Sequence, residues 1–320
     1  MAEASTDLAS LIRKEAARLG FAAIGFSSPT PQPLALQRFT DMIEEKRHGE
    51  MSYMEKRMEE RANPSLLLSC LHTIISVAIS YNYSLASRES LPKISKYALI
   101  EDYHPVVRGK LEKLLAAIKI LASEPLTGLI TVDSSPLLEK NWAEKAGIGK
   151  TGKNTLLQVP SAGSYLFLGE ILLDRALPSS KFTLPNVCGS CSKCLEHCPT
   201  GALVEPGKID ASKCISYLTV ELKREFTTEE AAMIGDWMFG CDLCQEVCPC
   251  NQQASITADP SFVLRNELVN ISTEKILSLT KSSFRELFYG TPVFRIGLRR
   301  LKRNARAVAE NLKKSQGLKR

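Results

Sequence analysis

Eight cysteines in the second half of the chain carry the clearest chemical signal in the sequence. Thiolates are soft ligands that suit iron–sulfur clusters and zinc. The first four cysteines follow the pattern Cys-x2-Cys-x2-Cys-x3-Cys-Pro, a lone cysteine comes next, and the last three follow Cys-x2-Cys-x3-Cys-Pro. In chain order they are Cys188, Cys191, Cys194, Cys198, Cys214, Cys241, Cys244 and Cys248. The first run has the spacing typical of proteins that bind two [4Fe–4S] clusters.

The spacing also predicts how the cysteines divide between the clusters. In two-cluster bacterial ferredoxins the fourth cysteine of each run ligates the other cluster. Applied here, one cluster is held by Cys188, Cys191, Cys194 and Cys248. The other is held by Cys198, Cys214, Cys241 and Cys244, where Cys214 replaces the missing first cysteine of the second run. Each cluster then has four thiolates and none is left over.

Zinc and disulfide bonds are the two alternative uses of these cysteines. Zinc ribbons pair Cys-x2-Cys knuckles but rarely add Cys-Pro after each run. Disulfides need an oxidising compartment, and charges interrupt the start of the chain, which lacks the uniform apolar region of a secretory leader. Two cysteines lie outside the pattern. We expect Cys70 to be a small core residue and Cys250 to be a bystander of the Pro249 turn, where a free thiol near a cluster could be redox-sensitive.

Composition and charge narrow the class of protein. The 320 residues are 44% hydrophobic and 24% charged, which is ordinary for a globular protein. This length supports two domains, or one large domain with an insert. No apolar stretch approaches the roughly 20 residues of a membrane span, so we expect a cytoplasmic protein. The net charge is +6, and residues 294–320 contain ten Lys and Arg against one Glu. A basic stripe of this kind suits a polyanion such as nucleic acid, and it suits a solvated helix end equally well.

The elements that must position the cysteines fall into three parts. Strands alternate with helices over residues 1–178, which predicts an α/β domain. The cluster module follows at 179–255, and a basic helical segment occupies 256–320. In the first part we expect helices at 6–19, 34–46, 107–122 and 136–146, and strands at 21–26, 73–80, 129–132, 155–159 and 165–173, the last two completing the sheet.

A glycine-rich stretch, Gly147 to Asn154, partly resembles a phosphate-binding loop. It lacks the Ser or Thr that would hold magnesium, because Asn154 stands at that position, and a helix precedes it instead of a strand. We therefore expect Gly149 and Gly152 to shape a turn that approaches a ligand or a neighbouring backbone closely.

With two clusters placed behind an α/β domain, the chain resembles the epoxyqueuosine reductase family over nearly its whole length. The motifs that carry the resemblance, besides the cysteine array, are Met51-Ser52-Tyr53-Met54 with Arg57, Lys96-Tyr97-Ala98, Asp102-Tyr103-His104, Val132-Asp133-Ser134-Ser135-Pro136, Gly147-Ile148-Gly149, Gly152-Lys153-Asn154-Thr155, Gly169-Glu170-Ile171 and Arg303-Asn304-Ala305.

The resemblance implies a fold, a reaction and cofactors. The expected fold is a cobalamin-binding α/β domain, similar to nitroreductases and reductive dehalogenases, fused to a ferredoxin-like two-cluster module and a HEAT-like helical segment. The implied reaction removes the epoxide oxygen of epoxyqueuosine at the wobble position of tRNA, using two electrons and two protons. Two [4Fe–4S] clusters and cobalamin would be the cofactors. The partners would be tRNA carrying epoxyqueuosine and an external electron donor of flavodoxin or ferredoxin type, with the enzyme as a monomer.

The resemblance also assigns a general acid. Asp133 matches the family's proton donor, and we expect burial at the C-terminal end of a strand to raise its pKa and keep it protonated. The alternative from the residues alone is that Asp133 caps a helix beginning at Pro136. No histidine is expected below cobalt, and His104 is expected in a turn.

Further residues are expected around the cofactor. Arg57 and Tyr97 match positions that line the cobalamin or substrate pocket, although a surface salt bridge and a core tyrosine are the plainer alternatives. Gln158 is a polar residue in an apolar strand and a candidate partner for a corrin amide. Cys241 and Asp242 would border the corrin where cluster and cofactor meet.

The chain departs from the family pattern in two places. Lys150-Thr151 replaces the usual aromatic residue of the glycine-rich loop, and the extra helical repeats of longer members are missing, so the grip on tRNA would come from residues 291–320. Two other functions remain open on the sequence: a ferredoxin-like electron carrier, and a cobalamin-dependent reductive dehalogenase of a small molecule. Export signals are common in the dehalogenases, and the basic tail favours a polyanionic substrate.

Overall fold

The first part of the chain is built on a four-stranded sheet. The computed structural model describes residues 2–85, 92–122, 124–180, 184, 187–257 and 259–317. The strand order is β1 (Ala23–Ser27), β2 (Thr73–Ser80), β7 (Leu166–Leu173) and β4 (Gly128–Thr131), and every neighbouring pair is antiparallel. β2 is a continuous apolar and β-branched run with seven of its eight residues buried, as expected for a central strand covered on both faces.

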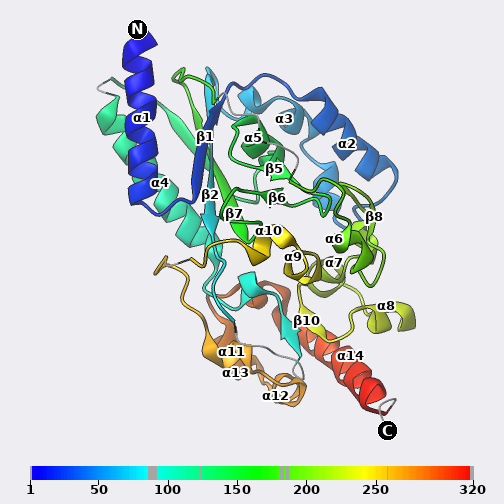
Figure 1. Ribbon diagram of the computed structural model, residues 1–320. Coiled ribbons are helices and arrows are strands. Elements are labelled where there is room, and N and C mark those ends of the chain that lie inside the picture. The colour runs from blue at the N-terminus through cyan, green and yellow to red at the C-terminus, as the bar shows by residue number, and fades with distance from the viewer. Residues whose placement is uncertain are drawn as a thin grey trace.

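Helices cover both faces of this sheet (Figure 1). α4 (Tyr103–Leu121) packs on β7 and in turn supports α1 (Ala2–Arg18), while α5 (Glu139–Lys145) contacts β2 and β7 from the opposite face. α4 buries a stripe at helical spacing that comprises Val107, Leu111, Leu114, Leu115 and Ile118. Asp102 caps its N-terminus by accepting a hydrogen bond from the His104 backbone N–H.

One set of short elements completes the α/β part, and another forms the cysteine-containing module. The short elements of the α/β part are α2 (Pro33–Glu44), η1 (Ser52–Glu55), α3 (Met58–Ala62), η2 (Pro64–Leu66), β3 (Lys93–Ile94), η3 (Lys96–Ala98), β5 (Lys150–Thr151) and β6 (Leu157–Gln158). The module contains α6 (Lys193–Glu196), β8 (Leu203–Glu205), β9 (Lys208–Ile209), η4 (Ala211–Lys213), α7 (Ile215–Val220), α8 (Thr228–Met233), β10 (Trp237–Phe239), α9 (Leu243–Glu246) and α10 (Pro249–Gln252). α8 begins with a capping box formed by Thr227 and Glu230.

The C-terminal segment is helical, as expected, and packs under the module. It comprises α11 (Asn266–Val269), α12 (Thr273–Ser278), α13 (Lys281–Phe288), η5 (Pro292–Ile296) and α14 (Gly297–Gly317). α14 buries an apolar stripe that includes Leu301, Ala305 and Val308. Arg303 is buried as well, because its guanidinium donates to the backbone carbonyls of Leu218 in α7 and of Leu222 just after it.

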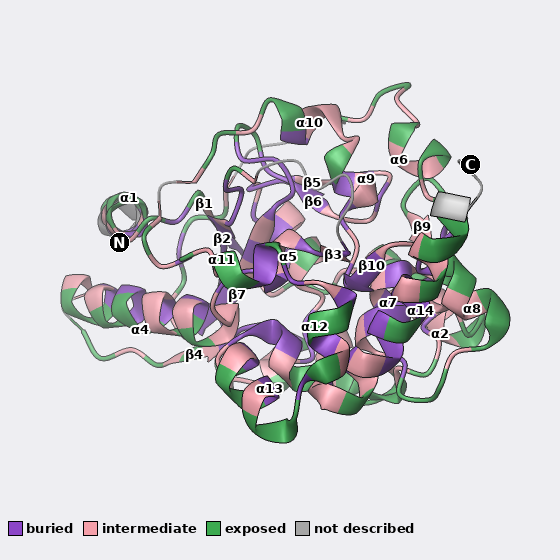
Figure 2. Cartoon of the chain, turned by 90° about the horizontal axis from the view of Figure 1, so that it is seen from below, coloured by how far each residue is buried: buried purple, intermediate pink, exposed green. Residues whose placement is uncertain are grey.

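The hydrophobic core runs through all three predicted parts. β3, from the α/β part, pairs in parallel with β10 of the module, and α14 packs against β10. One contiguous cluster of buried side chains therefore includes Ile75, Phe239 and Leu301. Buried residues fill the middle of the molecule, whereas α1 and α4 expose their outer faces (Figure 2). The proposed boundaries at 178 and 255 stay a prediction.

Three local expectations are wrong. Residues 155–159 do not join the sheet, because Thr155 adopts a positive φ of 65°, β6 pairs with β5 in a separate hairpin, and Val159 forms an isolated bridge with Gly163. The helix expected at 136–146 begins at Glu139, after a turn. Cys70 is exposed, with a φ of 61°. Within the described residues, no helix has the length and apolar character needed to span a bilayer.

Candidate active site

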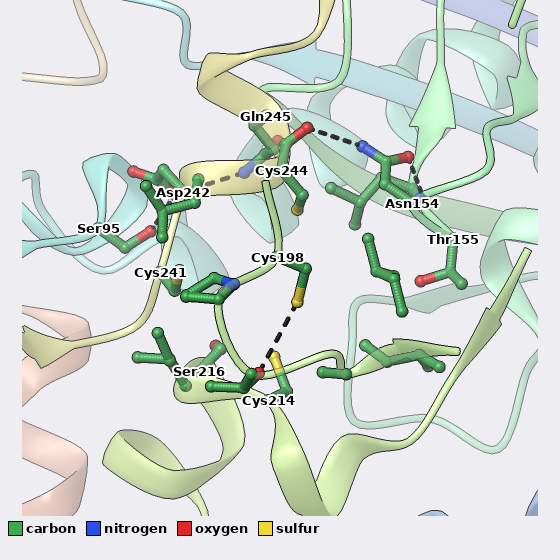
Figure 3. Close-up of a pocket in the computed structure, with 18 of the residues that line it drawn as sticks. Ser95, Asn154, Thr155, Cys198, Cys214, Ser216, Cys241, Asp242, Cys244 and Gln245 are labelled. Carbon is green, nitrogen blue, oxygen red and sulfur yellow. Dashed lines mark hydrogen bonds between the residues drawn. The ribbon is translucent and has the colours of Figure 1, made fainter. Parts of the chain in front are cut away.

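The cysteines surround two separate cavities. A cavity of about 260 Å³, the second cysteine cavity, is lined by Cys198, Cys214, Cys241 and Cys244, whose side chains lie around a common space (Figure 3). A smaller one of about 50 Å³, the first cysteine cavity, is lined by Cys188, Cys191, Cys194 and Cys248, together with Cys250. This division matches the two sets expected from the spacing. Among the described residues, no three His, Cys, Asp or Glu side chains lie close enough together to hold a single metal ion.

Short helices and the glycine-rich loop hold these thiols in place. Cys214 and Cys248 are the N-cap residues of α7 and α10. The backbone N–H of Lys153 donates to the Cys188 sulfur at 3.4 Å, and its ammonium donates to the carbonyls of Gly189 and Cys191. A Cβ at Gly149 would lie 2.8 Å from the Gln158 carbonyl oxygen, so this turn does approach a neighbouring backbone closely.

Asp242 fastens the module to the segment that carries Tyr97. Its carboxylate is buried and accepts hydrogen bonds from the Ser95 hydroxyl at 2.5 Å and the Lys96 backbone N–H at 2.6 Å. Ser95 and Lys96 are the two residues directly before Tyr97, which lies in η3. As a result, Tyr97 lines the second cysteine cavity on one side and a larger chamber on the other.

That larger cavity, the active-site chamber, has a volume of about 600 Å³ and draws its walls from all three parts of the chain. Its lining includes three tyrosines, two carboxylates and three cations, which are Tyr53, Tyr97, Tyr103, Asp133, Glu221, Lys223, Arg295 and Arg300. Aromatic rings offer flat apolar surface, and the cations favour an anionic ligand. A chamber of this size and lining fits a large ligand that has both planar and charged parts.

Asp133 occupies a turn directly after β4 and is held there from three directions. Its Oδ2 accepts hydrogen bonds from the Tyr103 hydroxyl and from His104 Nε2, both at 3.1 Å. Its backbone N–H donates to Glu139 Oε1 at 2.7 Å, so its φ of 55° is stabilised by α5. Asp133 is not the cap of a helix at Pro136. The sheet is antiparallel, so the rule that parallel sheets bind ligands at their carboxyl edge does not explain its position.

The charges around Asp133 differ from those expected. The hydrogen bonds that His104 donates to Asp102 and, second, to Asp133 raise the pKa of His104 to about 9. The His104 hydrogen bond in turn lowers the pKa of Asp133. The expected upward shift is wrong because the Asp133 side chain is 47% exposed and has a cationic partner. Burial instead raises the pKa of Glu139 to about 7.

The other expected cofactor residues are scattered. Gln158 is buried beside the first cysteine cavity, donates to Asn154 Oδ1 at 3.4 Å and leaves its Oε1 without a partner among the described residues. Cys241 and Asp242 line the second cysteine cavity. Arg57 lies at the N-terminus of α3, half exposed and paired with Glu60 at 2.9 Å, and it lines neither cysteine cavity nor the chamber.

Sequence reasoning missed two partners of Asp133. His104 was expected in a turn and lies in the first turn of α4, where its Nδ1 also bonds Asp102 Oδ1 at 2.6 Å. Glu139 was not singled out at all. A pattern in the sequence could have located His104. The Asp102-Tyr103-His104 motif precedes the periodically spaced apolar residues of α4, and together they place the histidine at the rigid end of that helix.

Two family models and several relatives match the chain. Residues 187–251 match the 4Fe-4S double cluster binding domain, and residues 61–134 match the model described as Epoxyqueuosine reductase QueG, DUF1730. The module is thus a two-cluster iron–sulfur domain. The epoxyqueuosine reductase of Cellulophaga algicola is 37% identical over 294 residues, covering 92% of this chain and 95% of the relative.

Solved structures agree with the sequence comparison. A crystal structure of epoxyqueuosine reductase with an epoxyqueuosine-modified tRNA-Tyr stem loop matches with a TM-score of 0.87 and 29% identity, covering 96% of this chain and 82% of that one. The Bacillus subtilis enzyme, with its catalytic aspartate loop swung out of the active site, matches with a TM-score of 0.85 and 29% identity over 98% of this chain and 83% of that one. This chain therefore belongs to the epoxyqueuosine reductase family and is an oxidoreductase.

Proposed function

We propose that this protein reduces epoxyqueuosine in tRNA to queuosine, with two [4Fe–4S] clusters and cobalamin as cofactors. One observation carries the proposal. Asp133 faces a chamber whose wall, Tyr97, also lines the second cysteine cavity, so a proton source and an electron source border the same space.

The cysteines fit two clusters with four ligands each. The first cysteine cavity would hold the cluster bound by Cys188, Cys191, Cys194 and Cys248, and the second cysteine cavity the cluster bound by Cys198, Cys214, Cys241 and Cys244. Burial raises the pKa of Cys241 and of Cys244, and the positive charge of bound iron would offset that effect on the thiolates.

The cavities around the second cluster also fit a ligand as large as cobalamin. The active-site chamber meets the second cysteine cavity at Tyr97. A further cavity of about 580 Å³, the basic recess between α2, α3, the start of α5 and the β8–β9 hairpin, meets it at Thr155 and Ile209. Tyr97 and Asp242, which line these cavities, would hold the cofactor. Gln158, whose Oε1 has no partner among the described residues, lines the first cysteine cavity, and Arg57 lines none of the cavities, so both stay proposals from the sequence. When bound, the clusters and cobalamin would supply the two electrons of the reduction.

The chain itself supplies one of the protons. Opening the epoxide and removing its oxygen as water takes two electrons and two protons. At neutral pH the shifted pKa values place the proton on His104 and leave Asp133 ionised. A proton on His104 Nε2 can pass to Asp133 Oδ2, 3.1 Å away, and from there to the substrate oxygen in the chamber. Tyr103 keeps the accepting carboxylate aimed, and Glu139 keeps its loop in place.

The cationic side of the chamber suits the RNA backbone. Arg295 and Arg300 line the chamber, and Arg299 and Arg306 are exposed on α14. Phosphate contacts by these side chains would position the anticodon loop, give salt-dependent affinity and carry little sequence information. We further propose a monomeric cytoplasmic enzyme that receives electrons from a flavodoxin or ferredoxin type of donor.

The test is an anaerobic reaction with tRNA that carries epoxyqueuosine. Reconstituted protein is mixed with a strong reductant, with and without cobalamin, and the tRNA is digested to nucleosides for mass spectrometry. Loss of one oxygen atom that requires cobalamin supports the proposal. No conversion by protein that holds both clusters but binds no cobalamin would instead favour an electron carrier. No conversion with cobalamin bound would point to another substrate, including a small halogenated one.

A further inference from the structure

The basic recess contains cations that the reaction does not use. Five basic side chains line it, namely Arg38, Arg47, Arg61, Lys140 and Lys208. Arg47 and Lys208 are both paired with Glu45, which offsets part of their charge. Of the three carboxyl groups that also line the recess, Glu139 already accepts the Asp133 N–H.

Arg61 and Lys140 face the recess without a counter-ion. Neither makes an ion pair within 4 Å among the described residues. Arg61 lies over the Phe39 ring at 5.0 Å, and its buried Nε has no hydrogen-bond acceptor in the described chain. Lys140 projects into the recess from α5, where it donates one hydrogen bond to the Thr155 carbonyl at 2.9 Å. Burial lowers the pKa of Arg61. An unpaired, partly desolvated guanidinium is costly unless an anion completes it, and the exposed Lys140 ammonium lines the same recess.

We infer that Arg61 and Lys140 bind a phosphodiester, and that this phosphodiester belongs to the nucleotide tail of cobalamin. The inference rests on the proposed function, because it assigns one end of the proposed cofactor. Guanidinium and ammonium groups together are the usual partners of a phosphate.

The position of the recess favours the cofactor tail over RNA. α2, α3 and α5 gather on one side of the sheet (Figure 1), and the recess adjoins the second cysteine cavity at Thr155 and Ile209. The cationic residues that suit RNA, Arg295 of η5 and Arg300 of α14, line the active-site chamber instead. A corrin lying against the second cluster can therefore extend its tail into the recess while RNA enters from the chamber.

The experiment compares two corrins that differ only in the tail. Cobalamin and cobinamide, which lacks the nucleotide and its phosphodiester, are titrated by absorbance into protein with reconstituted clusters. Wild type should bind cobalamin roughly ten- to a hundredfold more tightly, as expected for one or two charge-assisted contacts. The double variant Arg61→Met, Lys140→Met should lose that advantage and bind cobinamide as well as wild type does. Lys145→Met is the matched control, since Lys145 is on the same helix but bonds Thr30 outside the recess.

The possible outcomes separate the inference from the proposed function. If wild type binds both corrins equally, or the double variant keeps its preference for cobalamin, the inference is wrong and the proposed function stands. If the double variant instead loses affinity for an anticodon stem-loop RNA in fluorescence anisotropy and keeps that preference, the phosphate is that of RNA and the inference is also overturned. If wild type binds neither corrin, the proposed function fails and the inference falls with it.

Discussion

The Asp133–His104 pair allows the sharpest prediction, because the size of the pKa shift of His104 follows from the geometry of its hydrogen bonds. His104 has two carboxylate partners, Asp102 at 2.6 Å and Asp133 at 3.1 Å. Together they raise its pKa from 6.5 to about 9. The closer partner, Asp102, contributes more. Replacing Asp133 by Asn removes the weaker one, so the pKa of His104 should fall by about one unit, or about 1.4 kcal/mol. It should not return to 6.5 while Asp102 remains.

The assay is a pH titration followed by NMR of protein labelled at histidine. The chain has four histidines, so few signals need assignment. His104→Gln identifies the signal, and Asp102→Asn should lower the pKa more than Asp133→Asn does. A His104 pKa below 7 in wild type, or one that Asp133→Asn leaves unchanged, would refute the proposed proton source.

The same pair links stability to pH. The folded-state pKa of His104 is raised, so its stabilising effect is full below pH 6.5 and is lost as the pH rises through about 9. The shift would correspond to about 3 kcal/mol, and solvent screening of a side chain that is 27% exposed reduces this to about 2 kcal/mol. Chemical denaturation at pH 6 and at pH 10 should differ by less in His104→Gln than in wild type. An unchanged difference would contradict the linkage.

Three further predictions concern the clusters, the RNA and the core. Cys214→Ala should remove one cluster and leave the other, so the iron content should fall by half; two intact clusters by iron analysis and electron paramagnetic resonance would refute the ligand assignment. Arg295→Met should weaken RNA binding and reduce the slope of log affinity against log salt by about one, whereas Arg18→Met on the remote helix α1 should not; an unchanged slope would exclude a phosphate contact. Arg303→Met should destabilise the fold by about 2–4 kcal/mol in denaturant unfolding, because the carbonyls of Leu218 and Leu222 lose a buried donor; a loss below about 0.5 kcal/mol would show that water replaces it.

The sequence predicts elements well where one apolar period dominates. β2 is found at the expected residues 73–80 because every position in it favours a buried strand. α4 follows from the stripe that begins at Val107, although its first turn extends back to Tyr103. Residues 155–159 fail because the same apolar letters also suit a short hairpin. The choice depends on the positive φ at Thr155, which no local pattern reveals.

The candidate site shows the same division between local and long-range information. Cysteine spacing is local, and the two cysteine cavities match it. Electrostatics depends on neighbours far apart in the chain, so the pKa of Asp133 was predicted in the wrong direction. Its partner His104 is 29 residues away and comes from another element. The burial of Arg303 is equally non-local, since its acceptors lie 81 and 85 residues earlier.

One measurement tests the central claim most directly: a single turnover of epoxyqueuosine-containing tRNA by wild type and by Asp133→Asn. Both proteins are loaded equally with clusters and cobalamin, reduced, and sampled for nucleoside mass spectrometry. We predict that wild type removes the epoxide oxygen and that Asp133→Asn does so at least about a hundredfold more slowly, the usual effect of losing a general acid. No conversion by fully loaded wild type, or equal rates in the two proteins, would contradict the account.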